Sequence, residues 1–564
     1  MGGTLGGTPP GVANHHGHTP RRSTAERATH FLRLRQLGEL SGMPNPVTYA
    51  LMHGVNPDTG RPLGFEGYEY LLQPLNDLSP RLVLQKGAQV GATVLAILRT
   101  LWFLDVKKAH SLYLFPTHKS AQRFSKGRFA VLVERSPRLK SLFKAVKTGN
   151  HMRAGNVNFY CHGARSRAEL MSVPIQYLTI DERDEMYHGA EGSRQPWSAV
   201  ELARQRLKGQ SESWELDLST PTIPNHGIHA DFLQSDQRLF HPRCPHCGKW
   251  IPLSWPEVVR EPGEFCCPGC RHVWTDAERR QALRHGLWIP TWTGREQRGY
   301  HIPQLLSPVV TAAGLLGDWH AAQGHGSALQ VFFNAVLGLP YVAEGARLAR
   351  HFLEEAMVRG GEPMAAQATQ PTVMGVDVGP TWLHVVLAVP GNAALTPGGA
   401  GGVALRIVWA GKVSQWSELV GLLRQFQVQS FVIDAQPETH LARDLVAMYP
   451  AGWLCYYRPG GLLLDPLRRL VRVARTESLD ALYRLWRLGH VAAPTDLPGE
   501  FLDHLQAPVR LVRLRRDGQP CADYVETGPD HYAHAANYCL LALHLRTGPC
   551  QFSLTPPRDG LFAW

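Results

Sequence analysis

The sequence predicts an α/β protein of two domains, and three observations support that prediction. Short apolar segments alternate with helical stretches in two separate parts of the chain, which is the pattern that α/β sheets produce. A compact group of cysteines lies between these two parts. The chain of 564 residues is also too long for a single hydrophobic core.

The first α/β pattern runs from about residue 68 to residue 242. Its short apolar segments predict buried strands, and the longer apolar stretch after the first of them predicts a helix. The predicted strands are residues 81–85, 111–115, 176–180 and 214–219, and the predicted helix is residues 93–103.

The second α/β pattern begins near residue 373 and continues to about residue 546. Its predicted strands are residues 373–378, 384–389, 403–409 and 430–434. Before this pattern, residues 346–371 include a stretch that contains Gly, Ala and Gln, and we expect an interdomain linker there.

The composition narrows the class of protein. Hydrophobic residues make up 44% of the chain, yet no apolar run reaches the roughly 18–20 residues that span a bilayer. Residues 1–24 are rich in Gly, Thr and His and lack the apolar block of a signal peptide, so they predict a disordered tail. The formal net charge of +11 favours a polyanionic partner such as nucleic acid.

A possible phosphate-binding loop follows the first predicted strand. Gly87, Gly91 and Thr93 suit a loop whose backbone N–H groups meet phosphates at the start of a helix. The usual lysine before the hydroxyl residue is replaced by Ala92, whereas Lys86 stands at the start of the loop and could reach the same phosphates from the other side. From the loop alone, a glycine-containing turn between strand and helix is an equally good interpretation.

Two carboxylates at the end of a later strand strengthen the loop prediction. Asp181 can hold the Mg²⁺ of a nucleotide, and Glu182 can orient or deprotonate an attacking water. A solvated acidic turn is the alternative, because Arg183, Asp184 and Glu185 follow directly. Taken together, the loop and the carboxylates predict a site that binds ATP with Mg²⁺, with Glu182 as the catalytic residue.

The cysteine group has the spacing of a structural zinc site. Two C-x-x-C pairs are separated by nineteen residues, and each pair carries a glycine or proline that favours a tight turn. The four predicted ligands of one Zn²⁺ ion are Cys244, Cys247, Cys267 and Cys270, within an insert over residues 243–275. Cys266 is an adjacent spare, and His246 and His272 are alternative ligands. A site closed by four sulfurs leaves no position for a substrate, so we expect it to stabilise the fold.

Three aspartates of the second pattern fit the order of acids in an RNase H-like fold. Asp377 lies inside an apolar strand, Asp434 ends another strand, and Asp530 begins a late helix with His534 one turn further on. Acids placed in this way can hold two Mg²⁺ or Mn²⁺ ions that cleave a phosphodiester. Taken singly, Asp530 could be a helix cap and Asp434 could end a strand in a turn.

Arginines are frequent near these aspartates. They are Arg468, Arg469, Arg472 and Arg475, followed by Arg510, Arg513, Arg515 and Arg516. Their spacing among Leu and Val predicts elements with one cationic face. A solvated surface is the commoner explanation of such runs, but within a nuclease domain we expect contacts with DNA phosphates.

These segments together resemble a known family, the large terminase subunit of tailed bacteriophages, in its GpA-type branch. The resemblance extends from about residue 65 to 545, in the order of the family. The matching segments are residues 86–93, 116–117, 178–184, 219–222, the cysteine pairs, 333–340, 376–377 and 530–534. The lysine at the start of the phosphate loop, a departure from the general pattern, is what this family shows.

The resemblance implies a fold and a function for each part. It implies a RecA-like, P-loop-type ATPase domain over residues 25–345, an RNase H-like nuclease domain over residues 372–546 and a C-terminal tail over 547–564. Ser219, Thr220 and Pro221 would couple ATP hydrolysis to DNA movement. Arg165 stands where an uncharged residue is expected.

The family further implies a motor that works in the cytoplasm of a bacterial host. It would bind double-stranded concatemeric DNA together with a small terminase subunit, cut it, dock on the capsid portal and pump DNA inward with ATP. The packaging form would be a homo-oligomeric ring, commonly a pentamer, with no membrane partner.

Two other classes of protein share parts of this pattern. A superfamily-2-type helicase or repair ATPase with a zinc ribbon would have the same first half, but it should carry a second RecA-like domain with arginine motifs. A DNA-binding scaffold with degenerate sites would use only the zinc and the basic faces. Assays of ATP hydrolysis and of metal-dependent plasmid cleavage separate all three.

Overall fold

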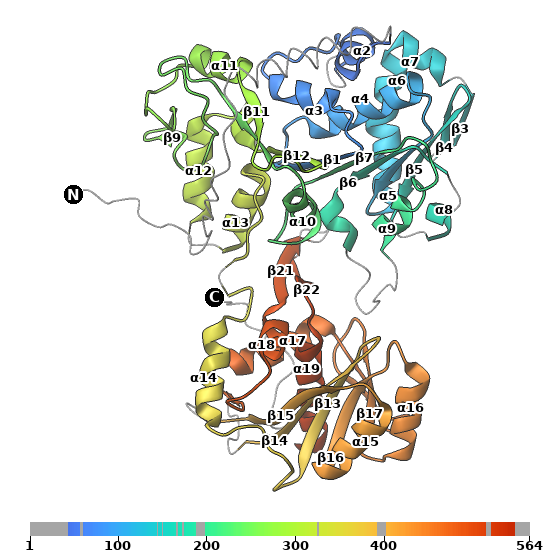
Figure 1. Ribbon diagram of the computed structural model, residues 1–564, viewed down its shortest axis with the longest axis vertical. Coiled ribbons are helices and arrows are strands. Elements are labelled where there is room, and N and C mark those ends of the chain that lie inside the picture. Colours follow the sequence, from blue (N-terminus) through green and yellow to red (C-terminus); the bar gives the residue numbers. More distant parts are fainter. Residues whose placement is uncertain are drawn as a thin grey trace, which may run out of the picture.

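The computed structural model describes residues 43–56, 60–143, 145–148, 151–164, 167–171, 174–187, 198–323, 326–343, 345–391, 402–514 and 520–547. The predicted tail at residues 1–24, Arg165 and all of the predicted C-terminal tail except residue 547 lie outside these ranges. The described part forms two units, each built on one large sheet, which follow one another along the longest axis of the molecule (Figure 1). We call them the first unit and the second unit.

The first unit has a mainly parallel sheet, ten strands wide in the described part of the chain. Seven neighbouring strands run parallel, and antiparallel strands close both edges. In sheet order the strands are β11 (Leu287–Pro290), β8 (Arg238–His241), β12 (Arg298–Ile302), β1 (Arg81–Lys86), β7 (Trp214–Ser219), β6 (Tyr177–Asp181), β2 (Ser111–Phe115), β5 (Val157–Gly163), β4 (His151–Ala154) and β3 (Ala145–Thr148). The four strands predicted for this part of the chain are confirmed. They are inner strands, and their residues are largely buried on both faces, as in a covered parallel sheet.

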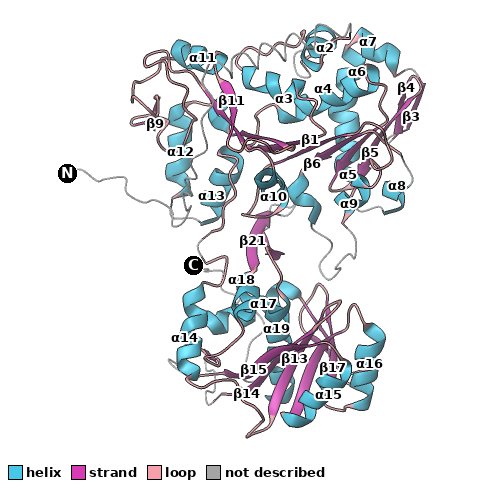
Figure 2. Ribbon diagram, in the orientation of Figure 1, coloured by secondary structure: helices cyan, strands magenta, loops and turns pink. Residues whose placement is uncertain are grey.

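Helices cover both faces of this sheet (Figure 2). Those of the first unit are α2 (Pro46–His53), α3 (Leu72–Asn76), α4 (Ala92–Asp105), α5 (His118–Phe124), α6 (Ala130–Arg135), α7 (Pro137–Leu142), α8 (Arg167–Met171), α9 (Ala199–Arg204), α10 (Gly227–Gln234), α11 (Asp276–Arg284), α12 (Ala312–Ala322) and α13 (Gly326–Val331). Short 3-10 turns lie at Glu69–Leu71, Arg183–Tyr187 and Gln304–Leu306, and π-helical turns at Ser125–Phe129 and Phe332–Val336. The predicted helix 93–103 is α4, which begins one residue earlier and is apolar all round because it is buried.

The cysteine insert forms a small lobe beside this sheet. It contains the two-stranded sheet of β9 (Val259–Arg260) and β10 (Glu264–Phe265), and it packs on α12. In its core, Cys244, Cys267 and Trp274 pack with apolar residues of α12 and of the π-helical turn Phe332–Val336. A lobe with so few apolar residues of its own depends on this packing and on its cysteines.

The second unit has a mixed sheet, eight strands wide in the described ranges. Its first three strands form an antiparallel meander, and the fourth lies parallel to and beside the first. In sheet order the strands are β18 (Leu463–Asp465), β19 (Leu470–Val473), β17 (Gly452–Tyr457), β16 (Val428–Asp434), β13 (Thr372–Val378), β14 (Leu383–Pro390), β15 (Leu405–Val413) and β20 (Val491–Ala492). This is the strand order predicted for an RNase H-like fold, and it is not the second parallel RecA-like sheet that a helicase would carry.

Five helices of the second unit follow its first strands in the chain, and a sixth precedes them. They are α14 (Arg350–Gly360), α15 (Trp416–Gln425), α16 (Thr439–Met448), α17 (Arg475–Arg487), α18 (Gly499–Gln506) and α19 (His531–Thr547). Buried α19 crosses β13, β14 and β16. Helix α14 lies within the range predicted as the linker, and its Leu353 and Ala356 belong to the core of the second unit. No helix of the described residues is long and apolar enough to cross a bilayer.

A β-hairpin of the second unit reaches the first unit (Figure 1). It consists of β21 (Pro508–Leu514) and β22 (Pro520–Glu526), which pair in antiparallel fashion. Val509, Leu511 and Val525 form one buried cluster with Ile223 of the first unit. Because Ile223 follows the segment 219–222, this hairpin joins the second unit to the neighbourhood of the predicted coupling residues.

Candidate functional sites

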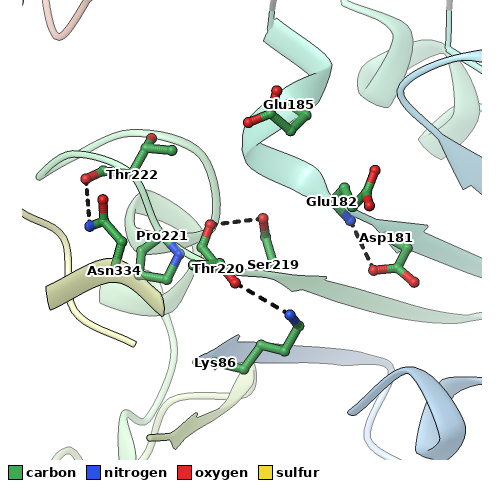
Figure 3. Close-up of a pocket in the computed structure, with 9 residues that line it drawn as sticks. All are labelled: Lys86, Asp181, Glu182, Glu185, Ser219, Thr220, Pro221, Thr222 and Asn334. Atoms are coloured by element: carbon green, nitrogen blue, oxygen red, sulfur yellow. Dashed lines mark hydrogen bonds between the residues drawn. The ribbon is translucent and has the colours of Figure 1, made fainter. Parts of the chain in front are cut away.

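Three neighbouring parallel strands place the first candidate site at one edge of the first sheet. Strand β1 ends at Lys86, β7 at Ser219 and β6 at Asp181, and the register pairs Gln85 with Ser219 and Leu218 with Asp181. A cavity of about 260 Å³ opens there (Figure 3). It is lined by Lys86, Asp181, Glu182, Glu185, Ser219, Thr220, Pro221, Thr222 and Asn334. The carboxyl end of a parallel sheet is where α/β proteins commonly bind ligands.

Lys86 points across the end of the sheet towards the loop that follows β7 (Figure 3). Its Nζ donates a hydrogen bond of 3.3 Å to Thr220 Oγ1. Burial lowers the pKa of this amine, whereas the charges of Asp181 and Glu182 act in the opposite direction. A partly desolvated ammonium that donates to a hydroxyl is suited to take a phosphate as an additional partner.

The two carboxylates have different surroundings. Asp181 is buried, its Oδ2 accepts 2.9 Å from the Tyr113 hydroxyl, and its Oδ1 accepts 3.0 Å from the Glu182 N–H. Burial raises the pKa of Asp181, and Lys86 opposes that shift. Glu182 is exposed at the cavity wall, yet the surrounding protein still raises its pKa, with Asp181 and Glu185 adding to the effect.

Glu182 also has an uncommon backbone. Its φ is 57°, in the left-handed region that a residue with a side chain rarely adopts. Such a conformation costs about 1–3 kcal/mol and persists only where the neighbouring structure enforces it. Here the enforced turn directs Glu182 away from the strand and into the wall of the cavity, where a substrate water could reach it.

The remaining loop residues lie directly after Lys86 but do not line the cavity. The Gly87 N–H donates to Ile302 O at 2.8 Å, and the Ala88 N–H donates to Ala335 O at 2.6 Å. Gly91 has a φ of 80° and caps α4, which Ala92 and Thr93 begin. The loop is therefore a turn that connects the end of β1 to the start of α4 at the edge of the sheet. Part of its backbone is already hydrogen-bonded.

Asp184 is a site residue whose importance the sequence did not reveal. It is 1% exposed, and its Oδ2 accepts from Thr222 N–H at 2.8 Å and from Thr222 Oγ1 at 2.7 Å. Its Oδ1 accepts from Ile228 N–H at 2.7 Å, and its own N–H donates to Ser219 Oγ at 3.2 Å. Burial raises its pKa to about 6 in spite of these bonds. Asp184 thus ties the end of β6 to the loop after β7.

The four predicted zinc ligands converge in the insert. Their sulfurs all lie within 4.8 Å of one another, with 3.9 Å between Cys244 and Cys270 and 4.0 Å between Cys247 and Cys267. Tetrahedral Zn²⁺ bound by thiolates requires sulfur–sulfur separations of about 3.8 Å, so the residues fit the ion. The spare Cys266 turns away, since its Sγ donates to a backbone oxygen, that of Glu257.

The second candidate site lies at one end of the mixed sheet. Asp377 in β13 is fully buried, and Asp434 ends the neighbouring parallel strand β16. The register pairs Val376 with Ile433, which places the two aspartates at adjacent positions of the two strands. His531, the first residue of α19, lies with its Nδ1 2.8 Å from Asp377 Oδ2.

Asp530 joins this end of the sheet from the segment just before α19. Its Oδ2 lies 3.0 Å from His534 Nε2, which confirms that the two residues share a helix face. The same oxygen accepts from Arg475 Nη2 at 3.4 Å, and Arg475 also binds Glu526 Oε1 at 3.0 Å. Asp530 directly precedes His531, which contacts Asp377, while the Asp530 side chain itself groups with Glu526 and His534.

The arginines have several distinct roles rather than a single cationic face. Arg475 is mostly buried on Asp530, and Arg510 forms two bonds of 2.8 and 3.0 Å to Asp480. Arg468 is largely exposed and lies near Asp465. Arg515 and Arg516 lie outside the described residues. A contact with DNA phosphates is therefore not expected from Arg475, which already neutralises carboxylates of its own unit.

Comparisons with known proteins match both units. The family model of the phage terminase large subunit gpA ATPase domain matches residues 75–288, and that of the gpA endonuclease domain matches residues 297–393. The second range begins just before β12 of the first sheet and ends after β14 of the second. The two ranges together take in more than half of the chain.

Two individual proteins are informative. The terminase large subunit of Enterobacteria phage P21 is 24% identical over 349 residues, which cover 54% of this chain and 52% of that protein. The match thus spans about half the length of this relative. The crystal structure of the bacteriophage HK97 large terminase has a TM-score of 0.50 at 11% identity, and the match covers 89% of this chain and 99% of that one. This likeness supports the fold.

The fold and sites define a protein that joins a P-loop-type α/β unit, with a zinc-ribbon-like insert, to an RNase H-like unit. The chain belongs to the family of phage terminase large subunits of the gpA type.

Proposed function

We propose that this chain is the motor subunit that packages phage DNA. It hydrolyses ATP to move double-stranded DNA into a procapsid, and it cuts concatemeric DNA with a metal-dependent nuclease. Family membership supports this proposal, and one structural observation supports it most directly: Lys86, Asp181 and Glu182 share a single cavity with the loop of residues 219–222.

In the first unit, the residues divide the work of ATP hydrolysis. Lys86 supplies a positive charge for the phosphates, and buried Asp181 supplies an oxygen for the Mg²⁺ that accompanies ATP. Magnesium bound there would neutralise charge on the phosphates. Glu182, exposed at the cavity wall and held by its uncommon backbone, orients the attacking water or accepts its proton.

Ser219, Thr220 and Pro221 transmit the state of this site. Lys86 Nζ contacts Thr220 Oγ1, so a phosphate that draws Lys86 away would break that bond. Asp184 fixes the other side of the loop through Ser219 and Thr222. Ile223 then follows and packs against the hairpin β21–β22. Movement of the loop would thereby reach the second unit through a packed contact.

In the second unit, Asp377, Asp434 and Asp530 hold two Mg²⁺ or Mn²⁺ ions. Such a pair of ions stabilises the attacking water and the leaving oxygen of a phosphodiester. Two observations support this: Val376 of β13 pairs with Ile433 of β16, one residue before each aspartate, and His531, which follows Asp530, has its Nδ1 2.8 Å from Asp377 Oδ2. In this arrangement Arg475 already neutralises Asp530, so Asp530 would exchange one cationic partner for another on binding metal.

The other parts of the proposal concern partners. One Zn²⁺ on the four cysteines stabilises the insert. A small terminase subunit, the capsid portal and a homo-oligomeric ring complete the packaging machine in the infected bacterial cell. The net charge of +11 is consistent with a long polyanion as substrate.

The test uses the purified full-length chain and two assays. The first measures steady-state ATP hydrolysis with and without double-stranded DNA. The second measures cleavage of supercoiled plasmid by protein that a chelator has freed of divalent metal and that is then supplied with Mg²⁺ or Mn²⁺. Activity in both assays supports the proposal. ATP hydrolysis without any metal-dependent cleavage would contradict the proposed nuclease activity. Cleavage without ATP hydrolysis would contradict the proposed motor activity.

A further inference from the structure

Two histidines beside Asp377 have no part in the proposed cleavage by three aspartates. His384 lies in β14, directly opposite Asp377 in the antiparallel register with β13. His531 begins α19, and its Nδ1 lies 2.8 Å from Asp377 Oδ2. The short turn between β13 and β14 brings the first two residues together, and the start of α19 adds the third.

The geometry of these residues is that of a ligand set. One ring nitrogen of His384, one of His531 and a carboxylate oxygen of Asp377 all lie within 4.8 Å of one another. The two imidazole rings are stacked, with centroids 4.5 Å apart and planes 10° from parallel. Three donor atoms so close, from three separate elements, can reach one ion with small adjustments of their side chains.

Burial leaves the His384 ring available as a ligand, as it does the neighbouring His504 ring, whose Nδ1 also has no partner among the described residues. His384 is only 5% exposed, and among the residues that the structure describes no donor or acceptor reaches its Nδ1. A buried polar atom without a hydrogen bond costs about 1–3 kcal/mol, and native proteins rarely leave one without a purpose. An ion bound by His531 and Asp377 would give the His384 ring a partner.

A second group of possible ligands is a weaker candidate. A carboxylate oxygen of Glu526, one of Asp530 and a ring nitrogen of His534 also lie within 4.8 Å of one another. Both ring nitrogens of His534 are already engaged, Nδ1 with the Tyr457 hydroxyl at 2.9 Å and Nε2 with Asp530. Arg475 occupies the carboxylates of the other two residues.

The chemistry of the donors indicates the kind of ion. Magnesium prefers an octahedron of oxygens, whereas imidazole is a ligand of transition metals. Of the two ions that the proposed nuclease would use, Mn²⁺ is the transition-metal ion. A set of one carboxylate and two imidazoles therefore favours Mn²⁺ over Mg²⁺.

We propose that His384 and His531 are nitrogen ligands which, together with Asp377, bind a divalent transition-metal ion of the Mn²⁺ type. The inference rests on the proposed nuclease function and names part of its metal site. It makes Asp377 the shared residue of the aspartate set and of the histidine set.

The experiment measures metal binding directly. Mn²⁺ is titrated into the full-length protein, and free Mn²⁺ is counted by electron paramagnetic resonance. Removal of a ligand should raise the dissociation constant for Mn²⁺ by at least about tenfold in His384→Asn and in His531→Asn. Competition with Mg²⁺ should show that Mg²⁺ binding changes much less, so the preference for Mn²⁺ shrinks.

A spectroscopic readout separates ligation from mere packing. Spin-echo modulation of bound Mn²⁺ should show nitrogen couplings in the wild-type protein, and the couplings should weaken in each variant. The matched control is His504→Asn, because the His504 ring lies 5.7 and 5.8 Å from the other two rings but is outside the ligand set. Its Mn²⁺ affinity and nitrogen couplings should equal those of the wild type.

Two results would overturn the inference. One is Mn²⁺ affinity within twofold of wild type in both His384→Asn and His531→Asn. The other is bound Mn²⁺ without nitrogen couplings in the wild-type protein. If a variant does not fold, as judged by thermal denaturation without metal, the wild-type spectrum alone decides. Failure of the proposed nuclease is a different result, because wild-type protein would then not cleave plasmid with either metal.

Discussion

The two candidate sites both use strand register to position residues, but the second site also relies on side-chain ion pairs. In the first unit, Lys86, Ser219 and Asp181 end three adjacent parallel strands, so backbone register alone brings them together. In the second unit, register places Asp377 beside Asp434 in the same way. Asp530, however, comes from the start of α19, and Arg475 and His534 hold its carboxylate.

The difference separates two ways of positioning an acid. A residue at the end of a central strand cannot move without breaking the ladder of the sheet, so its place follows from the fold. The position of a residue held by side-chain ion pairs depends on its partners, and another ligand can replace those partners. We therefore expect substitutions at strand-end residues to remove activity outright, and substitutions around Asp530 to change stability as well.

The largest effect is expected for Asp377→Ala. Without this carboxylate the remaining acids cannot hold both ions in line with the phosphate, so plasmid cleavage should fall by at least about 10²-fold. ATP hydrolysis should persist, because its residues lie in the first unit. Cleavage and ATPase rates are measured on the same preparation. Cleavage at the wild-type rate would show that Asp377 is not part of a nuclease site.

Two substitutions test the first site with different outcomes. Glu182→Gln should lower ATP turnover on the order of 10²–10⁴-fold and leave ATP binding intact, because it removes only a group that acts on water. Lys86→Ala should weaken ATP binding itself. Equilibrium binding of a fluorescent ATP analogue and steady-state hydrolysis distinguish the two. Wild-type turnover in either variant would contradict the assignment.

The sequence predicted the strand-end residues because each lies in or directly after a short apolar segment whose length favours a strand. It predicted the cysteine set because the spacing of the two pairs is itself the signal. It did not predict the role of Asp184, whose partners Thr222 and Ile228 become neighbours only when β6 and β7 pair. For the same reason His384 went unnoticed, since its relation to Asp377 is a matter of strand register.

Arg475 shows a further limit of sequence patterns. Its place in a run of arginines indicated a cationic surface, whereas the folded chain turns it towards Glu526 and Asp530. The run does not distinguish an exposed arginine from one that neutralises a distant carboxylate. Similarly, the range predicted as a linker contains α14, whose apolar face joins the core of the second unit.

The zinc site allows a test of a third case, in which we expect a bound metal and not strand register to stabilise the cysteine insert. Cys247→Ser should remove bound zinc and lower the thermal stability of the insert, because ligand loss couples to local unfolding. Cys266→Ser is the matched control, since Cys266 Sγ bonds a backbone oxygen and is outside the cysteine set. Elemental analysis should find about one zinc per chain in the wild type and in the control. Zinc-free wild-type protein, prepared under reducing conditions, would rule out the site.

The role of Arg475 can be tested through stability. Arg475→Met leaves the buried Asp530 with one cationic partner fewer, so the free energy of unfolding should fall by about 1–3 kcal/mol. Urea denaturation of the full chain measures this change, and Arg475→Lys should lose less because it keeps the charge. ATP hydrolysis should remain near the wild-type rate. An unchanged unfolding free energy in Arg475→Met would show that Asp530 does not depend on this partner.

The smallest expected effect concerns pH. The protein around Glu182, together with the charges of Asp181 and Glu185, raises its pKa above the ordinary 4.5. Glu182 acts in its ionised form, so kcat/KM for ATP should fall as pH decreases through this raised pKa, which places the acid limb above pH 4.5. Glu185→Gln removes one of the neighbouring negative charges, which lowers the pKa of Glu182. The acid limb of Glu185→Gln should therefore move to lower pH, whereas the limb should vanish from the residual activity of Glu182→Gln. A limb that stays at the wild-type pH in Glu185→Gln would show that another group controls it.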